Sequence, residues 1–394
     1  MTIQFDNHTQ RIAAIDWLRG LVMILMALDH TSWFFNTHRI FADSVLLHET
    51  GNLLATEQFL TRWMTHICAP TFVFLAGTAI AVSQIQRRQQ GMLQAVIDRE
   101  LLMRGAFIAM LDLCVFSMAS GKIQMQVLYA IGISMMLMVP LQRLNPRLVF
   151  LLAIVILMGG ELLLMTWWEP GGEVPLWLAL TFAPVFGETY SVLYPALPWL
   201  AIMMLGWVFG EWIIANQSGS GSVERLLMIS GLSALVLFVL IRGLNGYGNM
   251  FMSLEGNTLV QWLHVSKYPP SLAYTLLELG LMSIVFALLI RLEIIRGVVS
   301  HSGPVLVFGQ TALFFYLAHF CVLLLLRFVL ERGDLAQSYW ITLLVLIILY
   351  PICRIYRALK WRYPQSFCVF YEISINTTFC RIFASFSFCS CCPA

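Results

Sequence analysis

A few side chains of the kinds that move protons or hold charge interrupt an otherwise apolar sequence. They are Asp29, His30, His66, Lys267, Tyr268 and His319. Imidazole titrates near neutral pH and a carboxylate can orient it, so these groups could together support general acid–base catalysis. Taken singly, each of the four besides Asp29 and His30 is better explained as an anchor at a membrane interface. The hypothesis of a site therefore depends on their convergence on one cavity.

Asp29 and His30 are adjacent residues near the end of the first apolar segment. Successive residues of a helix point about 100° apart, so Asp29 is not expected to orient the His30 ring. Each should instead meet a different neighbour on another helix. An ionisable group inside a membrane-spanning helix costs about 2.5–3.5 kcal/mol on insertion scales, which makes the pair a functional candidate. Alternatively, the two residues have a structural role only, with their hydrogen bonds satisfied by neighbouring groups.

Asp16 and Arg19 are three residues apart on one face of the same segment, roughly 15 Å before Asp29 at 1.5 Å per residue. They could hold a phosphate group, or form a local ion pair that positions the helix. Gln310 and His319 belong to a later apolar segment, residues 309–319, which contains a few polar side chains. We include Asp16, Arg19, Gln310 and His319 among the candidate substrate-binding residues.

Other chemistries lack their usual motifs. There is no Gly-rich phosphate loop, nucleophile elbow or zinc-protease helix motif. No His/Cys set has convincing metal-ligand spacing, so we expect no metal. The net charge of +2 and the absence of a basic stripe argue against nucleic acid as a partner. Without a covalent nucleophile, direct transfer of a chemical group to an acceptor activated by histidine is then the simplest chemistry.

The elements that must position these residues are predicted to be transmembrane helices. Hydrophobic residues make up 59% of the chain, charged residues 11%, and the mean hydropathy is +0.80, far from a soluble domain. The apolar runs are long enough to cross a bilayer as helices. We predict an all-α polytopic transmembrane helix bundle of about ten spans. They are residues 15–35, 63–83, 101–119, 123–141, 148–166, 195–214, 224–241, 271–290, 303–326 and 339–353.

Charge asymmetry predicts the orientation of this bundle. If the N-terminus is cytoplasmic, the cytoplasmic connections carry most of the Lys and Arg residues. Both termini are then cytoplasmic, and residues 36–62, 167–194 and 242–270 form long outer loops. We predict a cytoplasmic tail at 1–14 and one transmembrane domain at 15–362. Residues 363–394, rich in Cys, Phe and Ser, form an atypical tail, either a palmitoylated segment or a reading-frame artefact.

Four segments in this order resemble a known family, the heparan-alpha-glucosaminide N-acetyltransferase catalytic-domain family, and in particular its bacterial branch. They are RIAAIDWLRG at 11–20 with Asp29-His30 beyond it, THICAPTFVFLAG at 65–77, KYPPSL at 267–272 and FGQ at 308–310. The resemblance implies a multi-pass protein of the bacterial inner membrane. It also implies an acyltransferase that moves an acetyl group from acetyl-CoA to an amino or hydroxyl group of a saccharide.

The resemblance implies a histidine base. The catalytic histidine of lysosomal members lies in the first outer loop, where His38 and His48 do not align, so we assign the base to His30. Asp29 and His66 would orient or balance the charge of the site, and Lys267 with Tyr268 would hold substrate or a developing oxyanion. Arg19 would bind the CoA phosphates. A homo-oligomer is also compatible with the sequence.

Two other functions remain open. Intramembrane Asp and His residues also form proton relays, so a proton-coupled transporter or permease is the main alternative. Against it, the sequence shows no inverted repeat and no pair of Gly/Pro-broken helices in matching positions. A non-catalytic membrane partner is the third possibility.

Overall fold

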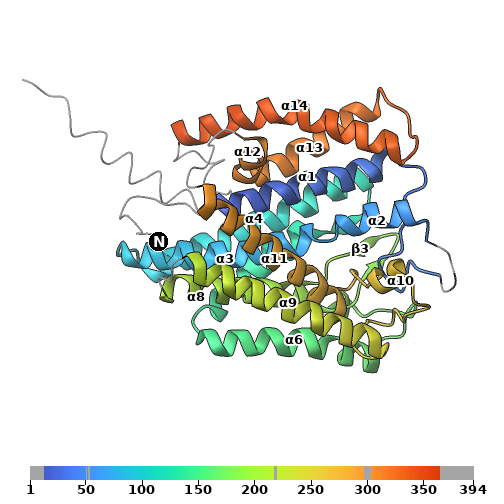
Figure 1. The fold of residues 1–394 in the computed structure, drawn as a ribbon, viewed down its shortest axis with the longest axis horizontal. Coiled ribbons are helices and arrows are strands. Elements are labelled where there is room, and N and C mark those ends of the chain that lie inside the picture. Colours follow the sequence, from blue (N-terminus) through green and yellow to red (C-terminus); the bar gives the residue numbers. More distant parts are fainter. Residues whose placement is uncertain (1–12, 50, 52–53, 217–219, 297–302, 364–394) are drawn as a thin grey trace, which may run out of the picture.

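The computed structural model describes residues 13–49, 51, 54–216, 220–296 and 303–363, and they form a bundle of long helices (Figure 1). The long helices are α1 (Ala13–Phe35), α3 (Cys68–Gln89), α4 (Gln94–Ser120), α5 (Val127–Leu141), α6 (Pro146–Trp167), α8 (Ala196–Asn216), α9 (Ser220–Leu244), α11 (Leu272–Arg296), α13 (Ala312–Arg327) and α14 (Leu335–Arg362). The short ones are α2 (Thr56–Met64), α7 (Leu176–Thr181), α10 (Leu259–Leu263) and α12 (Pro304–Gln310).

Each predicted span overlaps a helix; the second span overlaps the end of α2 and α3, and the ninth overlaps α12 and α13. In that span, α12 and α13 are bent by 102° at Thr311. Among the described residues, six helices are long and apolar enough to cross a membrane, or seven if the bent pair counts as one span. These helices agree with a multi-pass membrane protein. The count of ten spans and the cytoplasmic termini stay predictions, and residues 1–12 and 364–394 of the two predicted tails lie outside the described residues.

The prediction of an all-α fold needs one correction. Strands β1 (Ile123–Met125), β2 (Val185–Phe186) and β3 (Tyr190–Val192) form a small sheet in the order β1-β3-β2. β1 pairs with β3 in parallel and β2 pairs with β3 antiparallel. Such short strands have no amphipathic period of their own, which is why hydropathy does not predict them.

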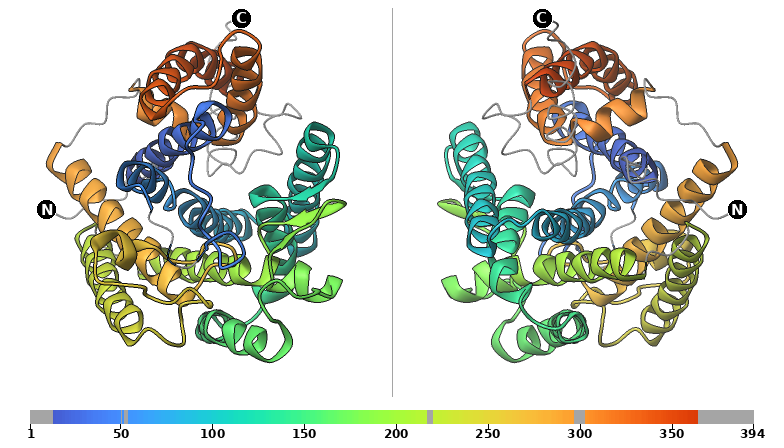
Figure 2. Two further views of the ribbon diagram at one scale, coloured as in Figure 1. Left: turned by 90° about the vertical axis from the view of Figure 1, so that its right-hand side faces the viewer. Right: turned by 90° about the vertical axis from the view of Figure 1, so that its left-hand side faces the viewer.

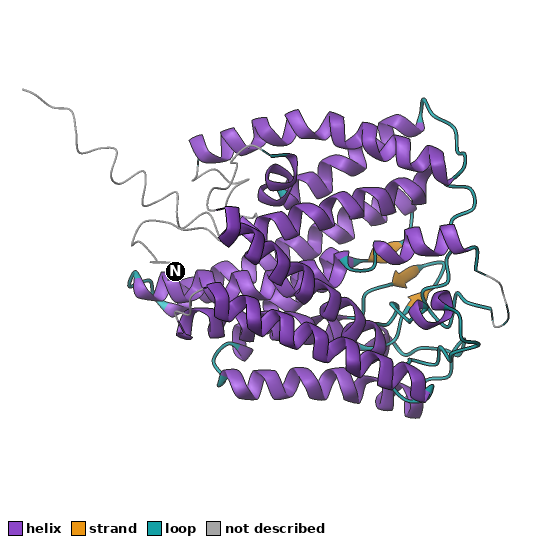
Figure 3. Cartoon of the chain, viewed as in Figure 1, coloured by secondary structure: helices purple, strands orange, loops and turns teal. Residues whose placement is uncertain are grey.

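The two ends of the bundle differ. The loop end carries residues 36–49, 51, 54–55, 121–126, 168–195, 245–271 and 328–334, with the sheet and α10 among them (Figure 3). The turn end carries the short connections 90–93 and 142–145 and the start of α1. The three predicted outer loops therefore gather at one end, where they pack on one another.

Helix α1 lies inside the bundle, in contact with α3, α11, α12, α13 and α14 (Figure 2). Its approach to α12 depends on glycine. A Cβ atom on Gly20 would lie 1.8 Å from the Val305 carbonyl oxygen, and one on Gly309 would lie 1.9 Å from the Asp16 carbonyl oxygen. Small residues let membrane helices pack backbone to backbone, so these two glycines set the position of α1 against α12.

Three acidic residues of the long helices act as caps for other segments. Asp112 accepts hydrogen bonds from the backbone N–H groups of Gln126 and Tyr129, at 2.6 and 3.0 Å. Glu161 accepts from Gly248 and Met250 at the loop end, and Glu293 from Ala13 and Ala14 at the start of α1. Carboxylates that satisfy exposed backbone donors stabilise helix starts and turns. These acids therefore have a structural explanation.

Candidate functional site

A cavity of about 1120 Å³, counting the space at its opening, lies between α1, α3, α4, α5 and the bent pair α12–α13. We call it the main cavity. Its walls are mostly apolar, with a few polar groups at each end, as is usual for small-molecule sites. The polar lining residues are Arg19, Asp29, His30, Thr65, Tyr194, Lys267, Gln310 and Tyr316.

The main cavity extends along α1. Arg19 and Gln310 line it toward the turn end, whereas Asp29, His30 and Lys267 line it toward the loop end. Eleven residues of helix separate Arg19 from His30, which is about 16 Å. Five of the nine candidate residues thus line one cavity. The remaining four, Asp16, His66, Tyr268 and His319, are buried or nearly so and lie behind its wall.

Asp29 belongs to a network of charges and does not contact the His30 ring in any hydrogen bond. Both of its carboxylate oxygens accept from Nη1 of Arg62, at 2.6 and 2.7 Å. One oxygen also accepts from Nη2 of Arg39 at 2.8 Å and from the Thr65 hydroxyl at 2.9 Å. The expectation that Asp29 meets neighbours outside α1 is confirmed by these contacts.

Asp43 is the second carboxylate of this network. Its Oδ2 atom accepts from Nε of Arg62 at 2.7 Å, so one guanidinium bridges two carboxylates. Burial alone would raise the pKa of the Asp43 carboxyl, but the Arg62 guanidinium beside it holds that pKa well below its usual range. Asp43 also fixes the loop end, because its backbone oxygen accepts from the N–H groups of Lys267 and Tyr268 at 2.8 and 3.1 Å.

His66 contacts Asp43 and not the main cavity. Its Nε2 atom lies 3.1 Å from Oδ1 of Asp43, and only the nitrogen can donate in that contact. The ring is 2% exposed, and its Nδ1 atom has no hydrogen-bond partner among the described residues. His66 therefore supports Asp43 and is not placed to take a proton from a ligand in the main cavity.

His30 and His319 form a chain of two imidazoles that ends at the main cavity. Nδ1 of His319 lies 3.1 Å from the carbonyl oxygen of Phe315, which can only accept, so Nδ1 carries the proton. Nε2 of His319 is then an acceptor for Nδ1–H of His30, at 2.7 Å. The remaining nitrogen, Nε2 of His30, is left without a proton in the neutral ring. Because His30 lines the main cavity, this chain fits a general base.

Lys267 and Tyr268 belong to the segment between α10 and α11, whereas His319 belongs to α13. Lys267 is 3% exposed yet lines the main cavity, so its ammonium group faces enclosed space. The Tyr268 hydroxyl lies 3.3 Å from that of Tyr194, which also lines the cavity. Burial, followed by the neighbouring Tyr268, raises the pKa of Tyr194 well above its usual value, so the Tyr194 hydroxyl keeps its proton.

The polar groups that line the turn end of the main cavity come from α1 and α12, and α14 supports them from behind. Arg19 Nη1 lies 3.8 Å from Asp16 Oδ1, as the three-residue spacing predicts. The Gln310 side-chain oxygen accepts from Arg357 at 3.0 Å, and its backbone oxygen accepts from Lys360 at 3.4 Å. The bend after Gln310 exposes that backbone oxygen to α14, so cationic side chains satisfy the broken helix.

Sequence reasoning missed Arg62, Asp43 and Tyr194. All three lie in segments that hydropathy assigns to outer loops, where charged residues usually face water. Their burial results from loops folding back over the helix ends. One signal was available for Arg62, since it lies one helical turn before His66 in a segment that continues into α3.

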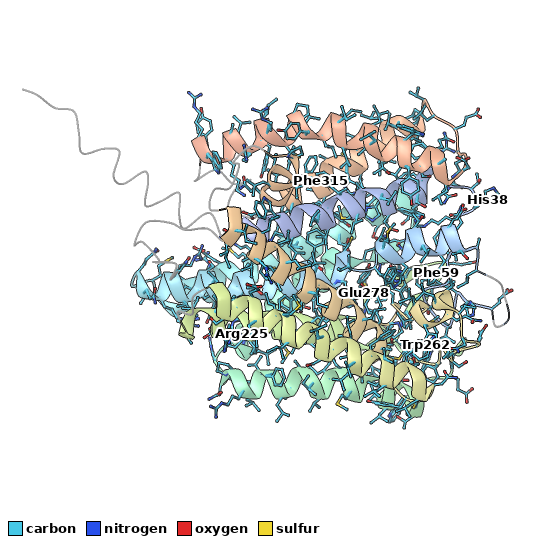
Figure 4. All side chains as sticks on the ribbon, viewed as in Figure 1. His38, Phe59, Arg225, Trp262, Glu278 and Phe315 are labelled. Atoms are coloured by element: carbon cyan, nitrogen blue, oxygen red, sulfur yellow. The ribbon has the colours of Figure 1, made fainter. Side chains whose placement is uncertain are left out.

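His38 and His48 do not reach the main cavity. His38 is exposed at the edge of the loop end (Figure 4), and His48 pairs with Glu255 at 3.0 Å. Among the described residues no group of three or more His, Cys, Asp or Glu side chains is arranged to hold a metal ion.

A family model described as "Heparan-alpha-glucosaminide N-acetyltransferase, catalytic" matches residues 11–242, a range that includes Asp29, Asp43 and Arg62. No curated protein matches the chain.

Proposed function

Because the chain belongs to the heparan-alpha-glucosaminide N-acetyltransferase catalytic family, we propose that it transfers the acetyl group of acetyl-CoA to an amino or hydroxyl group of a saccharide. The apolar helices make it an integral multi-pass protein, which we place in the bacterial inner membrane. In this proposal the acceptor reaches the main cavity from the loop end and acetyl-CoA from the turn end.

One observation carries the proposal, namely that His30 lines the main cavity while its Nδ1 atom lies 2.7 Å from Nε2 of His319, an arrangement that leaves Nε2 of His30 to accept a proton. His319 holds the His30 ring in the tautomer that a base requires, in the role that a carboxylate has in other enzymes. A base of this kind can activate the acceptor directly, without a covalent nucleophile on the protein.

The reaction then proceeds as direct transfer. The acceptor nitrogen or oxygen attacks the thioester carbonyl carbon while Nε2 of His30 takes the acceptor's proton. The carbonyl oxygen becomes negative, and the Lys267 ammonium, enclosed beside it, stabilises that charge. Collapse of the intermediate breaks the C–S bond, and CoA leaves as the thiolate, which receives a proton from the site. Asp29 and Asp43 hold Arg62 and thereby balance the charge near Lys267.

The test uses purified protein, radiolabelled acetyl-CoA and amino-sugar acceptors. His30→Ala should lower the transfer rate by about 10²–10⁴-fold while acetyl-CoA binding is retained, because only the proton acceptor is lost. His38→Ala, a histidine of the same loop end that is exposed and outside the main cavity, is the matched control and should keep the full rate. Full activity of His30→Ala would remove His30 from the mechanism.

The bent pair α12–α13 is the one observation that favours transport, because discontinuous helices line transporter sites. It is the single such pair in the described part of the chain, whereas transporter repeats place broken helices in both halves. An uptake assay in sealed vesicles separates the two functions. Uptake of a solute without any acetylated product would favour the transporter.

A further inference from the structure

A second cavity, of about 430 Å³ counting its opening, lies between α3, α4 and α5, nearer the turn end than the main cavity. We call it the inner cavity. It is lined by Ala79, Ile80, Ser83, Gln84, Arg87, Ile97, Glu100, Leu101, Arg104 and Met135. None of these residues takes part in the chemistry proposed for His30.

The inner cavity continues the walls of the main cavity on all three helices. On α3, Ala76 lines the main cavity and Ala79 the inner one, less than a turn further along. On α4, Ile108 lines the main cavity and Arg104 the inner one. On α5 the same order holds for Ile131 and Met135. Residues three or four apart share a helix face, so the two cavities lie in one row along these helices.

On α3 the lining of the inner cavity is apolar near the main cavity and polar beyond it, at Gln84 and Arg87, whereas on α4 the charged Arg104 lies nearest the main cavity. The polar groups of the inner cavity suit an anion. Arg87 pairs with Glu100, and Nη2 of Arg104 lies 4.0 Å from the same carboxylate, so the charged lining residues carry one more positive than negative charge. Gln84 is 5% exposed, and its Nε2 amide group has no hydrogen-bond partner among the described residues.

A buried amide donor beside two guanidinium groups matches a phosphate, which accepts several hydrogen bonds and prefers the fork of arginine. An unpaired buried donor destabilises the protein, so a ligand that accepts a hydrogen bond from Gln84 would offset that cost. The apolar part, formed by Ala79, Ile80 and Leu101, suits the chain that carries such a phosphate.

We propose that the inner cavity binds a phosphate group of acetyl-CoA, whose pantetheine arm passes along α3, α4 and α5 into the main cavity. The assignment to CoA rests on the proposed acetyl transfer. It moves the phosphates away from Arg19, which pairs with the Asp16 carboxylate at 3.8 Å. Arg87 and Arg104, by contrast, share the single carboxylate of Glu100.

The experiment compares binding of acetyl-CoA and acetyl-pantetheine, which lacks the nucleotide phosphates, by calorimetry on protein in neutral phosphatidylcholine nanodiscs. Arg104→Gln and Gln84→Leu should each raise the Kd for acetyl-CoA by about tenfold or more, the loss of one charge-assisted hydrogen bond. Neither should change the Kd for acetyl-pantetheine, which also shows that the variants are folded. Arg147→Gln, which removes an exposed arginine at the same end, is the control and should bind both ligands normally.

Three results would overturn the proposal. If acetyl-CoA binds both variants as it binds the wild type, the inner cavity holds no CoA phosphate. If Arg19→Gln alone weakens acetyl-CoA binding, the phosphates lie at α1 and α12. If phosphatidylglycerol raises the melting temperature of wild type but not of Arg104→Gln, with acetyl-CoA binding unaffected, the phosphate comes from a lipid headgroup.

Activity measurements on the wild type and the two variants distinguish an error in this inference from an error in the proposed function. The inference is wrong, and the function stands, if the wild type transfers acetyl groups and both variants keep its KM for acetyl-CoA. The proposed function is wrong if the wild type transfers no acetyl group at all.

Discussion

Arg62 bridges the carboxylates of Asp29, whose side chain is 15% exposed, and Asp43, whose side chain is 6% exposed, and its own side chain is 8% exposed. Removing it leaves two largely buried negative charges that lack this partner. We predict that Arg62→Ala lowers the free energy of unfolding by about 3–5 kcal/mol. Thermal melting in detergent measures this change.

Arg143→Ala is the matched control for that variant. Arg143 also pairs with an aspartate, Asp98 at 2.7 Å, but its side chain is 64% exposed. Exposed ion pairs contribute about 0–1 kcal/mol, so this variant should melt close to the wild type. Equal melting of both variants would show that the bridge between Asp29 and Asp43 has no structural role.

The Asp43 carboxyl makes this network sensitive to acid. Burial raises and Arg62 lowers its pKa, and the net pKa in the folded protein lies well below the value of about 3.9 in an unfolded chain. A group with a lowered folded-state pKa stabilises the fold above the unfolded pKa, and this contribution is lost as the pH falls below it. The difference in melting temperature between wild type and Asp43→Asn should therefore be constant above about pH 5 and shrink below about pH 4. A difference that stays the same at pH 3 would contradict the assignment.

At the scale of helices, α1 and α12 meet at glycine. A methyl group at Gly309 would overlap the Asp16 carbonyl oxygen, and one at Gly20 would overlap that of Val305. We predict that Gly309→Ala separates the two helices, lowers the melting temperature and weakens acetyl-CoA binding, at a cost of about 1–3 kcal/mol for overpacking.

Gly159→Ala controls for helix propensity. Gly159 lies within α6, and a Cβ atom added to it would have no atom of the described residues within 4 Å, so alanine fits there. Alanine in a helix is about 1 kcal/mol more favourable than glycine, and this variant should match or exceed the stability of the wild type. If both substitutions raised the melting temperature, the close contact between α1 and α12 would not constrain the fold.

At the scale of the whole molecule, the orientation in the membrane remains to be measured. The bias of Lys and Arg predicts that the turn end is cytoplasmic and the loop end external. Glu169, exposed at the loop end, and Gln90, exposed at the turn end, offer single-cysteine positions in a cysteine-depleted chain. An impermeant maleimide applied to intact cells should label Glu169→Cys and spare Gln90→Cys. The opposite pattern would invert the topology and the proposed sides of donor and acceptor.

The positions of the helices could be predicted from the sequence alone, because a run of apolar residues long enough to cross a bilayer is a local property. Every predicted span overlaps a helix. As helical geometry predicts, the His30 ring meets a partner other than Asp29, namely His319. Periodicity could not reveal the break at Thr311, since α12 and α13 are together as apolar as a continuous span.

The meeting of particular side chains could be learned only from the folded chain. His30 and His319 are 289 residues apart, and Arg62 reaches Asp29 and Asp43 because a loop folds back over the ends of the helices. Hydropathy assigns charged loop residues to water, so it cannot show a buried Asp43 or an enclosed Lys267. Contacts between distant segments depend on how the whole bundle packs, and local patterns in the chain do not encode that packing.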